Sequence, residues 1–311
     1  MTYTIKGALV PKKLTPGECV AFVSPASTPP RKWVEDGVEL LESMGLKVKI
    51  GTHVFDEYGY LAGKDENRLA DINDALRDPK IKAILATCGG KGAYRIADGL
   101  DFTAARKNPK LFIGFSENTI IHLSLFKQCG LAGLHGAAWN TEFGSKSAES
   151  FKRAILTTEP IIIQSNKSEP TAALTTGGKA TGILLGGNQD MIATAAGWAL
   201  PSFKGAILLL EAIGMKLGHI DRQLTMLQNA GHLTGIKAIA VGQYTDCTSG
   251  STTQGSWTAI DVLRDRLGKW GVPILGGLPI GHGKNPIAVP IGTRATLDAD
   301  AKTLTVESAV S

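Results

Sequence analysis

Residues 81–88, IKAILATC, decide the fold of this chain, because they form an almost continuous apolar run that ends directly before the glycine-rich loop 89–92. Such a run is typical of a strand that is buried on both faces of a parallel sheet. The run LFIGF at 111–115 has the same character. Segments with apolar residues at helical spacing separate the predicted strands, at 33–45, 66–79 and 116–130. This alternation predicts βαβ units and a mostly parallel sheet covered by helices, which is an α/β fold.

A change in composition near residue 145 indicates a second unit. Residues 146–175 are polar and broken by prolines, whereas strand and helix patterns resume from Lys179, in segments such as GAILLLE and IDRQLTMLQNAG. We therefore predict an N-terminal domain over 1–145, a linker over 146–175 and a C-terminal domain over 176–311.

The composition excludes several classes of function. The 311 residues carry a net charge of +5, but the basic residues are scattered and aromatic residues make up only 6%, so we expect no nucleic-acid partner. No window approaches the apolar length of a membrane span, and the N-terminus has no signal-peptide core, so we expect no membrane contact and a cytoplasmic protein. Four widely spaced cysteines and histidines without a ligand spacing predict no disulfide framework, no bound metal and no other cofactor.

Three polar residues lie next to or within apolar or glycine-rich stretches. Ser116 follows LFIGF, Glu211 follows AILLL, and His282 lies within PIGHG. A serine, a carboxylate and a histidine are the parts of an acyl-transfer triad, and this chain order is the one found in α/β-hydrolases. Each residue also has an ordinary structural interpretation. Ser116 fits a helix N-cap, Glu211 fits an ion pair between domains, and His282 fits an exposed loop.

The glycine-rich loop Gly89-Gly90-Lys91-Gly92 has a spacing that matches neither a P-loop nor a dinucleotide-binding fingerprint. Glycines at the end of a strand let a ligand approach the backbone closely, and their N–H groups can bind an anion. We therefore predict a cradle for an oxyanion or a carboxylate. A second glycine-rich segment, 186–190, precedes a predicted helix and fits a tight turn between domains.

These features occur together in one known family. The chain resembles the serine peptidases that comprise the LD-carboxypeptidases and the microcin C self-immunity proteins, from VSPAS at 23–27 to PIG at 290–292. The matching segments follow the family's order: VSPAS, GGKGAYRIADGLDF, IGFSENT, LHGA, LLGGNQ, LLLEAIG, HIDRQLTML and PIGHG. The resemblance implies a Rossmann-like N-terminal domain with a parallel sheet, a smaller C-terminal α/β domain and a homodimer.

The resemblance also implies roles for individual residues. Ser116 would be the nucleophile, His282 the base, and Glu211 the acid that orients the base. The oxyanion hole would use the backbone N–H groups of Glu117 and Gly92, with Gly90 as the second choice for the latter. The chain departs from the family's common loop, in which arginine and tyrosine stand where this sequence has Cys88 and Lys91.

The implied reaction is hydrolysis of the L,D-amide bond to a terminal D-alanine in a muropeptide, through an acyl-enzyme. The free carboxylate of that substrate suits a cationic pocket, for which Lys91 and Arg95, close to Gly90, are candidates. The alternative is a self-immunity hydrolase that acts on an aminoacyl-nucleotide, for which Trp139 offers an aromatic platform, although Trp139 also fits a core or interface position. A third interpretation is a small-molecule binding protein with two α/β domains and no chemistry.

Overall fold

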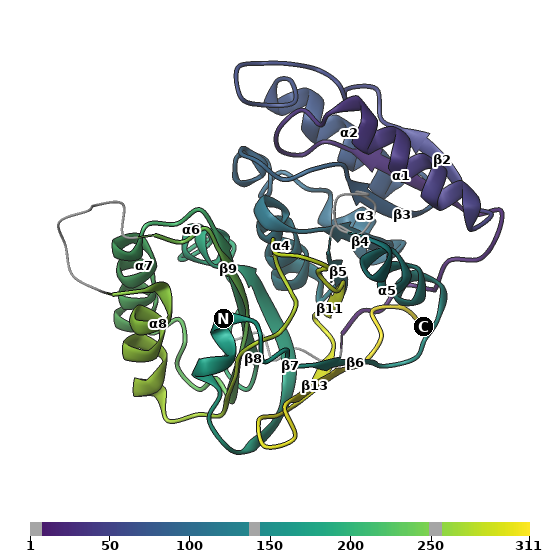
Figure 1. Cartoon of the computed structure of the whole chain (residues 1–311). Helices are drawn as coiled ribbons and strands as arrows, with labels where there is room; N and C mark the ends of the chain where they lie inside the picture. Colours follow the sequence, from purple (N-terminus) through teal and green to yellow (C-terminus); the bar gives the residue numbers. More distant parts are fainter. Residues whose placement is uncertain (1–7, 137–143, 249–256) are drawn as a thin grey trace.

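The computed structural model describes residues 8–136, 144–248 and 257–311, which form two β-sheets flanked by helices (Figure 1). The first sheet takes its strands from the N-terminal part of the chain, apart from one late strand. Its members are β1 (Cys19–Val23), β2 (Lys47–Ile50), β3 (Ile81–Ala86), β4 (Leu111–Gly114), β5 (Gly133–His135) and β11 (Val289–Ile291). Strands β1 to β5 pair in parallel, and β11 pairs with β5 in the antiparallel direction.

The helices of the first unit include one that reaches the second unit. They are α1 (Arg31–Ser43), α2 (Asp65–Arg77), α3 (Phe102–Lys107) and α4 (Thr119–Cys129), with the 3-10 turns η1 (Ala93–Arg95) and η2 (Ser116–Asn118). The α4 helix is buried from its first residue to Phe126, because it also packs against α6 and β7 of the second unit. It ends at Gly130, whose left-handed conformation is common at helix C-termini. The residues before α4 therefore lie where the two units meet.

The strand order of the first sheet locates a crevice. The order β2-β1-β3-β4-β5 reverses direction between β1 and β3. In doubly wound sheets, ligands bind outside the carboxyl ends of the strands at such a reversal. The loop at 89–92 follows β3, and Ser116 follows the neighbouring strand β4. Both sequence features therefore lie at the edge of the sheet where a ligand is expected.

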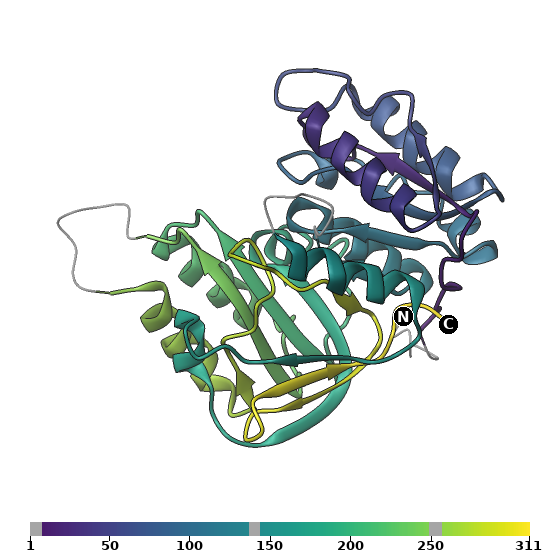
Figure 2. The same ribbon diagram turned by 45° about the vertical axis from the view of Figure 1, so that its right-hand side comes forward.

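The second sheet has a parallel half and an antiparallel half (Figure 2). The parallel half contains β7 (Lys179–Asn188), β8 (Ile207–Ile213), β9 (Ala238–Thr245) and β10 (Ile274–Leu275). The antiparallel half contains β12 (Arg294–Asp298), β13 (Thr303–Val306) and β6 (Ile161–Gln164). The helical segments of this unit are α5 (Ser145–Leu156), η4 (Pro170–Leu174), α6 (Gln189–Thr194), α7 (Leu217–Asn229), α8 (Ala259–Leu267) and η5 (Gly268–Trp270). In the described part of the chain, no helix has the length and apolar character needed to cross a membrane.

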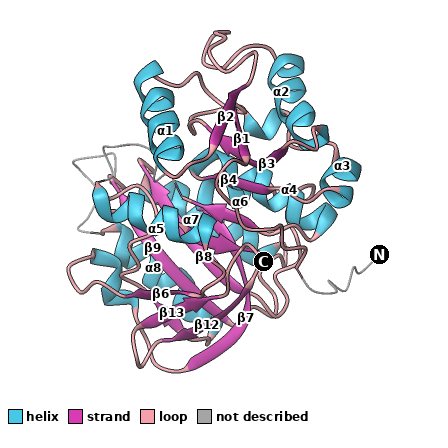
Figure 3. Ribbon diagram, turned by 90° about the vertical axis from the view of Figure 1, so that its right-hand side faces the viewer, coloured by secondary structure: helices cyan, strands magenta, loops and turns pink. Residues whose placement is uncertain are grey.

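The chain passes between the two sheets three times, from β5 to β6, from β10 to β11 and from β11 back to β12. The two units lie one above the other (Figure 3). Residues 146–175 contain α5 and the strand β6, which pairs with β13 at the edge of the second sheet. The chain later leaves the second sheet after β10 and enters the first sheet as β11, where Val289 pairs with His135. The predicted α/β fold, with a parallel-sheet N-terminal unit and a second α/β unit, is confirmed. The proposed domain boundaries at 145 and 176 stay a prediction.

Candidate active site

Ser116 lies on a sharp turn between β4 and α4. Its φ angle of 59° falls in the left-handed region that residues other than glycine rarely adopt. Strain of this kind marks serine nucleophiles that are presented on a strand-to-helix turn. The N-cap positions of η2 and α4 are occupied by Phe115 and Asn118. Ser116 is therefore not the helix N-cap that its local sequence also allowed.

Glu211 and His282 form a hydrogen-bonded pair. The Nδ1 atom of His282 lies 2.7 Å from Oε2 of Glu211. The Glu211 side chain has no exposed surface, whereas that of His282 keeps 11% of its surface exposed. Glu211 lies in β8 at a register shift between Leu210 and Ala212 in the pairing with β9. Irregularities of this kind redirect side chains next to active sites.

The ionisation of Glu211 fixes the proton arrangement of this pair. Burial, the largest influence, raises the pKa of Glu211, but the neighbouring imidazoles of His282 and His135 and a hydrogen bond from Asn188 outweigh it and hold this pKa below its ordinary value. An ionised carboxylate only accepts hydrogen bonds, so Nδ1 of His282 must carry the proton. The Nε2 atom is then left to accept a proton from a nucleophile.

Gln243 of β9 anchors the loop that carries His282. Its backbone N–H donates to the carbonyl of Ile280 at 2.8 Å, and its side-chain oxygen accepts from the N–H of Gly283 at 2.7 Å. These two bonds hold the loop on both sides of His282. Sequence analysis missed Gln243, because a single glutamine in a strand belongs to no recognisable motif.

Gly281 leaves no room for a side chain beside the Glu211–His282 pair. Its φ is +132°, and an added Cβ atom would lie 3.0 Å from Oε2 of Glu211. We expect Gly281→Ala to displace the carboxylate and to lower kcat by about 10²-fold, since misplacement by about 1 Å has effects of this size. Steady-state kinetics on the wild type and the variant measure the change.

Gly205→Ala is the control for this variant. Gly205 also has a positive φ, of +81°, but an added Cβ atom would meet nothing within 4 Å. Both variants therefore strain the backbone, and only one of them disturbs the pair. Equal activities of the two variants would show that strain alone, and not contact with Glu211, sets the effect.

Phe115, which precedes Ser116 in the chain, packs against His282. Its ring lies next to that of His282, with a distance of 4.6 Å between the ring centroids. Within the described residues, no hydrogen bond joins the hydroxyl of Ser116 to His282. Hydrogen bonds between catalytic groups are often long without substrate and shorten in the substrate complex. The structure therefore brings Glu211 and His282 together and places Ser116 next to a residue that packs on His282.

The glycine-rich loop wraps around the residues at the start of η2. An added Cβ atom on Gly89 would lie 3.1 Å from Oγ of Ser116. The N–H of Gly92 donates to Oε1 of Glu117 at 2.7 Å, and the carbonyl of Gly92 accepts from Nη1 of the buried Arg68 at 2.9 Å. The N–H of Gly92 is thus already bound to a carboxylate in this structure, and its place in the oxyanion hole stays a prediction.

Glu117 gives a test of this arrangement. Burial raises the pKa of its carboxyl group, although the N–H of Gly92 and the charge of Lys91 act in the opposite direction. A raised folded-state pKa means that the contribution of Glu117 to stability is present below the unfolded pKa of about 4.3 and is lost as the pH rises through the folded value. We expect the uncharged variant Glu117→Gln to unfold at a higher temperature than the wild type at pH 7, by a few degrees, and to lose that advantage below about pH 4.

Thermal unfolding at the two pH values measures this difference. Glu39→Gln is the control, because Glu39 is exposed on α1 and its replacement removes the same charge. A lower unfolding temperature for Glu117→Gln than for the wild type at pH 7 would contradict this expectation. It would show that the hydrogen bond between the N–H of Gly92 and the charged carboxylate outweighs the cost of burying that charge.

The cationic residues of the predicted pocket have different surroundings. Arg95 donates through Nε to both carboxylate oxygens of Asp65, at 2.9 Å each. Lys91 instead extends to the second unit, where its Nζ atom lies 3.8 Å from Oδ2 of Asp190. Lys91 therefore reaches from the first unit to the second, whereas Arg95 is bound within the first unit. Trp139, the candidate aromatic platform, lies outside the described residues.

Two further histidines lie close to the site in a buried setting. Burial lowers the pKa of His135 to about 4 and that of His122 to about 3. Both imidazoles are therefore neutral at pH 7. Across the described ranges, no group of three or more histidine, cysteine, aspartate and glutamate side chains is placed to hold a metal ion.

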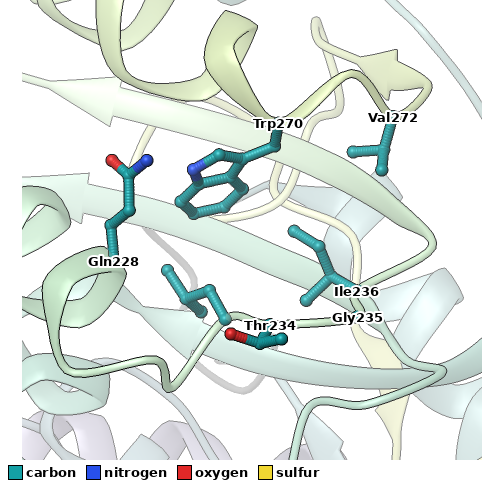
Figure 4. Close-up of a pocket in the computed structure, with 7 residues that line it drawn as sticks. Gln228, Thr234, Gly235, Ile236, Trp270 and Val272 are labelled. Atoms are coloured by element: carbon teal, nitrogen blue, oxygen red, sulfur yellow. The ribbon is translucent and has the colours of Figure 1, made fainter.

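A separate pocket lies in the second unit, away from these residues (Figure 4). It has a volume of about 250 Å³ and lies between the end of α7, the turn that follows it and η5. The ring of Trp270 faces Gln228 and Ile236 across it (Figure 4). Ser116, Glu211 and His282 do not line this pocket, so it lies apart from the candidate site.

Comparison with known proteins identifies the family. Residues 20–136 match the LD-carboxypeptidase N-terminal domain, and residues 181–297 match the LD-carboxypeptidase C-terminal domain. The chain belongs to the LD-carboxypeptidase family. As a member of this family it is a serine peptidase, which confirms the predicted family and enzyme class.

Relatives within the LD-carboxypeptidase family differ in their names. The probable murein peptide carboxypeptidase of Bacillus subtilis is 36% identical, over 97% of this chain and 95% of that protein. The microcin C7 self-immunity protein MccF of Escherichia coli is 25% identical, over 96% of this chain and 95% of that protein. The solved structure of MccF in complex with glutamyl sulfamoyl guanosine has a TM-score of 0.84 and 23% identity, and the match covers 97% of this chain and 100% of that one. This last likeness shows the shared fold.

Proposed function

We propose that this protein is an LD-carboxypeptidase that uses Ser116, His282 and Glu211 as its catalytic triad. The observation that carries the proposal is the left-handed conformation of Ser116 on a strand-to-helix turn, at the interface where Phe115 packs on the ring of His282. A serine held in this strained geometry has an exposed hydroxyl, as a nucleophile requires.

The reaction follows from the proton arrangement of the pair. Nε2 of His282 accepts the proton of the Ser116 hydroxyl while Oγ attacks the carbonyl carbon of the scissile amide. The imidazolium then gives this proton to the leaving amine, and an acyl-enzyme remains on Ser116. Water, deprotonated by the same nitrogen, hydrolyses the ester and restores the serine. Glu211 stabilises the imidazolium, because its Oε2 atom lies 2.7 Å from Nδ1 of His282.

The developing oxyanion needs two N–H donors. We assign them to Glu117, next to the nucleophile, and to Gly90 in place of Gly92. Gly90 has a φ of +100° and follows Gly89, whose Cα atom lies beside the Ser116 side chain. Backbone N–H groups in such glycine-rich turns form a cradle for an anion.

A muropeptide that ends in D-alanine is the substrate that we propose. The B. subtilis relative is named a murein peptide carboxypeptidase, and it covers nearly the whole chain at 36% identity. The second candidate is an aminoacyl-nucleotide, because MccF is a self-immunity protein and its solved structure contains glutamyl sulfamoyl guanosine. The interpretation as a binding protein without chemistry is abandoned, because the family consists of peptidases.

Product release from two substrates tests the proposal. One substrate is a murein tetrapeptide, read by free D-alanine, and the other is an aminoacyl sulfamoyl adenosine, read by free amino acid. Release of D-alanine alone is the expected result. Cleavage of the nucleotide conjugate alone would overturn the muropeptide assignment and would place the protein with the self-immunity hydrolases. The homodimer that the resemblance implies is tested separately by sedimentation velocity.

A further inference from the structure

Arg68 is a buried cation in the first unit. It lies on α2, and its side chain has no exposed surface. Its Nη1 atom donates to two backbone carbonyls, those of Pro25 and Gly92, the latter at 2.9 Å. Its Nη2 atom donates to Oδ1 of Asp65. One guanidinium group therefore joins the loop that follows β1 to the glycine-rich loop that follows β3.

Stability alone does not explain this buried charge. Removing a cation from water is costly, and an ion pair regains this cost only when the remaining donors are also satisfied. The Nε atom of Arg68 has no hydrogen-bond partner among the described residues. Its carboxylate partner Asp65 is shared, because Arg95 donates to both oxygens of Asp65. A buried donor without a partner calls for another explanation, and the two carbonyls that Arg68 binds supply one.

The glycine-rich loop links this anchor to the residues around the nucleophile. The N–H of Gly92 donates to Oε1 of Glu117 at 2.7 Å, and Glu117 directly follows Ser116 in the chain. The N–H of Lys91 donates to Oγ of Ser27 at 3.1 Å, so the loop after β1 holds the glycine-rich loop a second time. The loop at 89–92 is therefore fixed between the buried guanidinium on one side and the start of η2 on the other.

We propose that Arg68 is a positioning residue for the reaction, which holds the glycine-rich loop so that the N–H of Gly90 points at the developing oxyanion. This inference rests on the proposed carboxypeptidase function and adds a residue that acts through the loop without touching the substrate. Arginine suits this task, because its planar guanidinium is rigid and stays charged at neutral pH. Oxyanion donors act in the transition state, so a displaced loop slows turnover and leaves substrate binding nearly unchanged.

Arg68→Met tests the proposal by steady-state kinetics. Methionine has no charge, and apolar replacements of buried ionic groups often keep or raise stability. Asp65 retains Arg95 as a partner, so no carboxylate is left unpaired. We expect kcat for D-alanine release to fall by about 10²-fold, the effect of a misplaced catalytic group, while KM stays within about threefold. Arg68→Lys keeps the charge but ends about one bond short of Nη1, so its kcat should lie between those of the wild type and Arg68→Met.

Amide hydrogen exchange measures the anchoring of the loop without any substrate. The N–H groups of Lys91 and Gly92 are both hydrogen-bonded, so they exchange only when the loop opens. We expect them to exchange on the order of tenfold faster in Arg68→Met, because the carbonyl of Gly92 loses a hydrogen bond from a charged donor. Mass spectrometry of the peptic peptides that contain these two residues measures the change.

Lys110→Met is the matched control. Lys110 is also a buried cation of the first unit, and its Nζ atom donates to the carbonyls of Asp78 and Ile81, at 2.5 and 2.7 Å. It directly precedes β4, and Ile81 begins β3, so these bonds lie at the opposite end of the sheet from the glycine-rich loop. The variant thus loses a buried charge and two bonds to carbonyls. Its kcat, its KM and the exchange in the loop at 89–92 should equal those of the wild type.

The kinetic and exchange results together decide the inference. A kcat of Arg68→Met within about threefold of the wild-type value would overturn it, since a misplaced group costs far more. An equal loss of kcat in Lys110→Met would also overturn it, as would a loss in Arg68→Met without faster exchange in the loop. If Arg68→Met does not fold, Arg68→Lys is judged by the same two measurements. Absence of D-alanine release from the wild type would count against the proposed reaction, and unchanged exchange in the variants would still overturn the anchoring of the loop.

Discussion

Replacement of Ser116 by alanine is expected to lower kcat by about a millionfold, the size of effect seen when a triad nucleophile is removed. The fold should survive, because the Ser116 side chain is no helix cap. The left-handed φ of 59° is strained for serine and for alanine alike, so the variant gains or loses little stability through the backbone. D-alanine release under single-turnover conditions measures the loss.

Ser116→Gly separates the effect of losing the hydroxyl group from the effect of the strained backbone conformation. Glycine adopts a positive φ without cost, so this variant should unfold at a higher temperature than Ser116→Ala and should be equally inactive. Mass spectrometry of the wild type during turnover should detect an acyl group on the peptide that contains Ser116. Activity of Ser116→Ala within tenfold of the wild type would show that another residue is the nucleophile.

Glu211→Gln is expected to lower kcat by about 10⁴-fold, because an amide no longer forces the proton onto Nδ1 of His282. The variant should also be less stable at neutral pH. Since the folded pKa of Glu211 is lowered, its charge stabilises the protein above the ordinary carboxyl pKa, and this contribution is lost as the pH falls through the folded value. The difference in unfolding temperature between the wild type and Glu211→Gln should therefore be largest near pH 7 and should decline on acidification.

The double variant Ser116→Ala/Glu211→Gln tests whether the residues act as one unit. The effects of substitutions within a triad on kcat are strongly non-additive, because the base and the acid no longer contribute once the nucleophile is removed. We expect the double variant to be no slower than Ser116→Ala alone. Multiplication of the two losses would show that Glu211 acts in a step that does not involve Ser116.

The sequence predicted those parts of the fold and site that depend on local pattern. The apolar runs at 81–88 and 111–115 form the parallel strands β3 and β4. A strand that is buried on both faces consists mostly of apolar residues, so the run of such residues predicts it. The position of Ser116 followed from the junction between one such strand and a helix. Local sequence cannot distinguish a nucleophile from an N-cap, and it took the backbone conformation around Ser116 to exclude the N-cap.

The parts that sequence could not predict depend on long-range packing. The carboxylate of Glu117 accepts a hydrogen bond from the N–H of Gly92, 25 residues earlier in the chain, and no local pattern predicts this bond. The contact between Lys91 and Asp190 joins two units whose relative placement no short motif encodes. Gln243 was missed for the same reason, because its partners lie about 40 residues away in the loop around His282.

The path of β11 has a consequence for biosynthesis. The segment that carries His282 leaves the second sheet at Leu275 and enters the first sheet at Val289, where it covers the open edge of β5. A nascent chain whose residue Ile291 is still inside the ribosome therefore carries Ser116 but leaves the edge of β5 unpaired, and unpaired edges invite association with other chains. Peptidase activity should begin only late in translation, when the final strands complete both sheets.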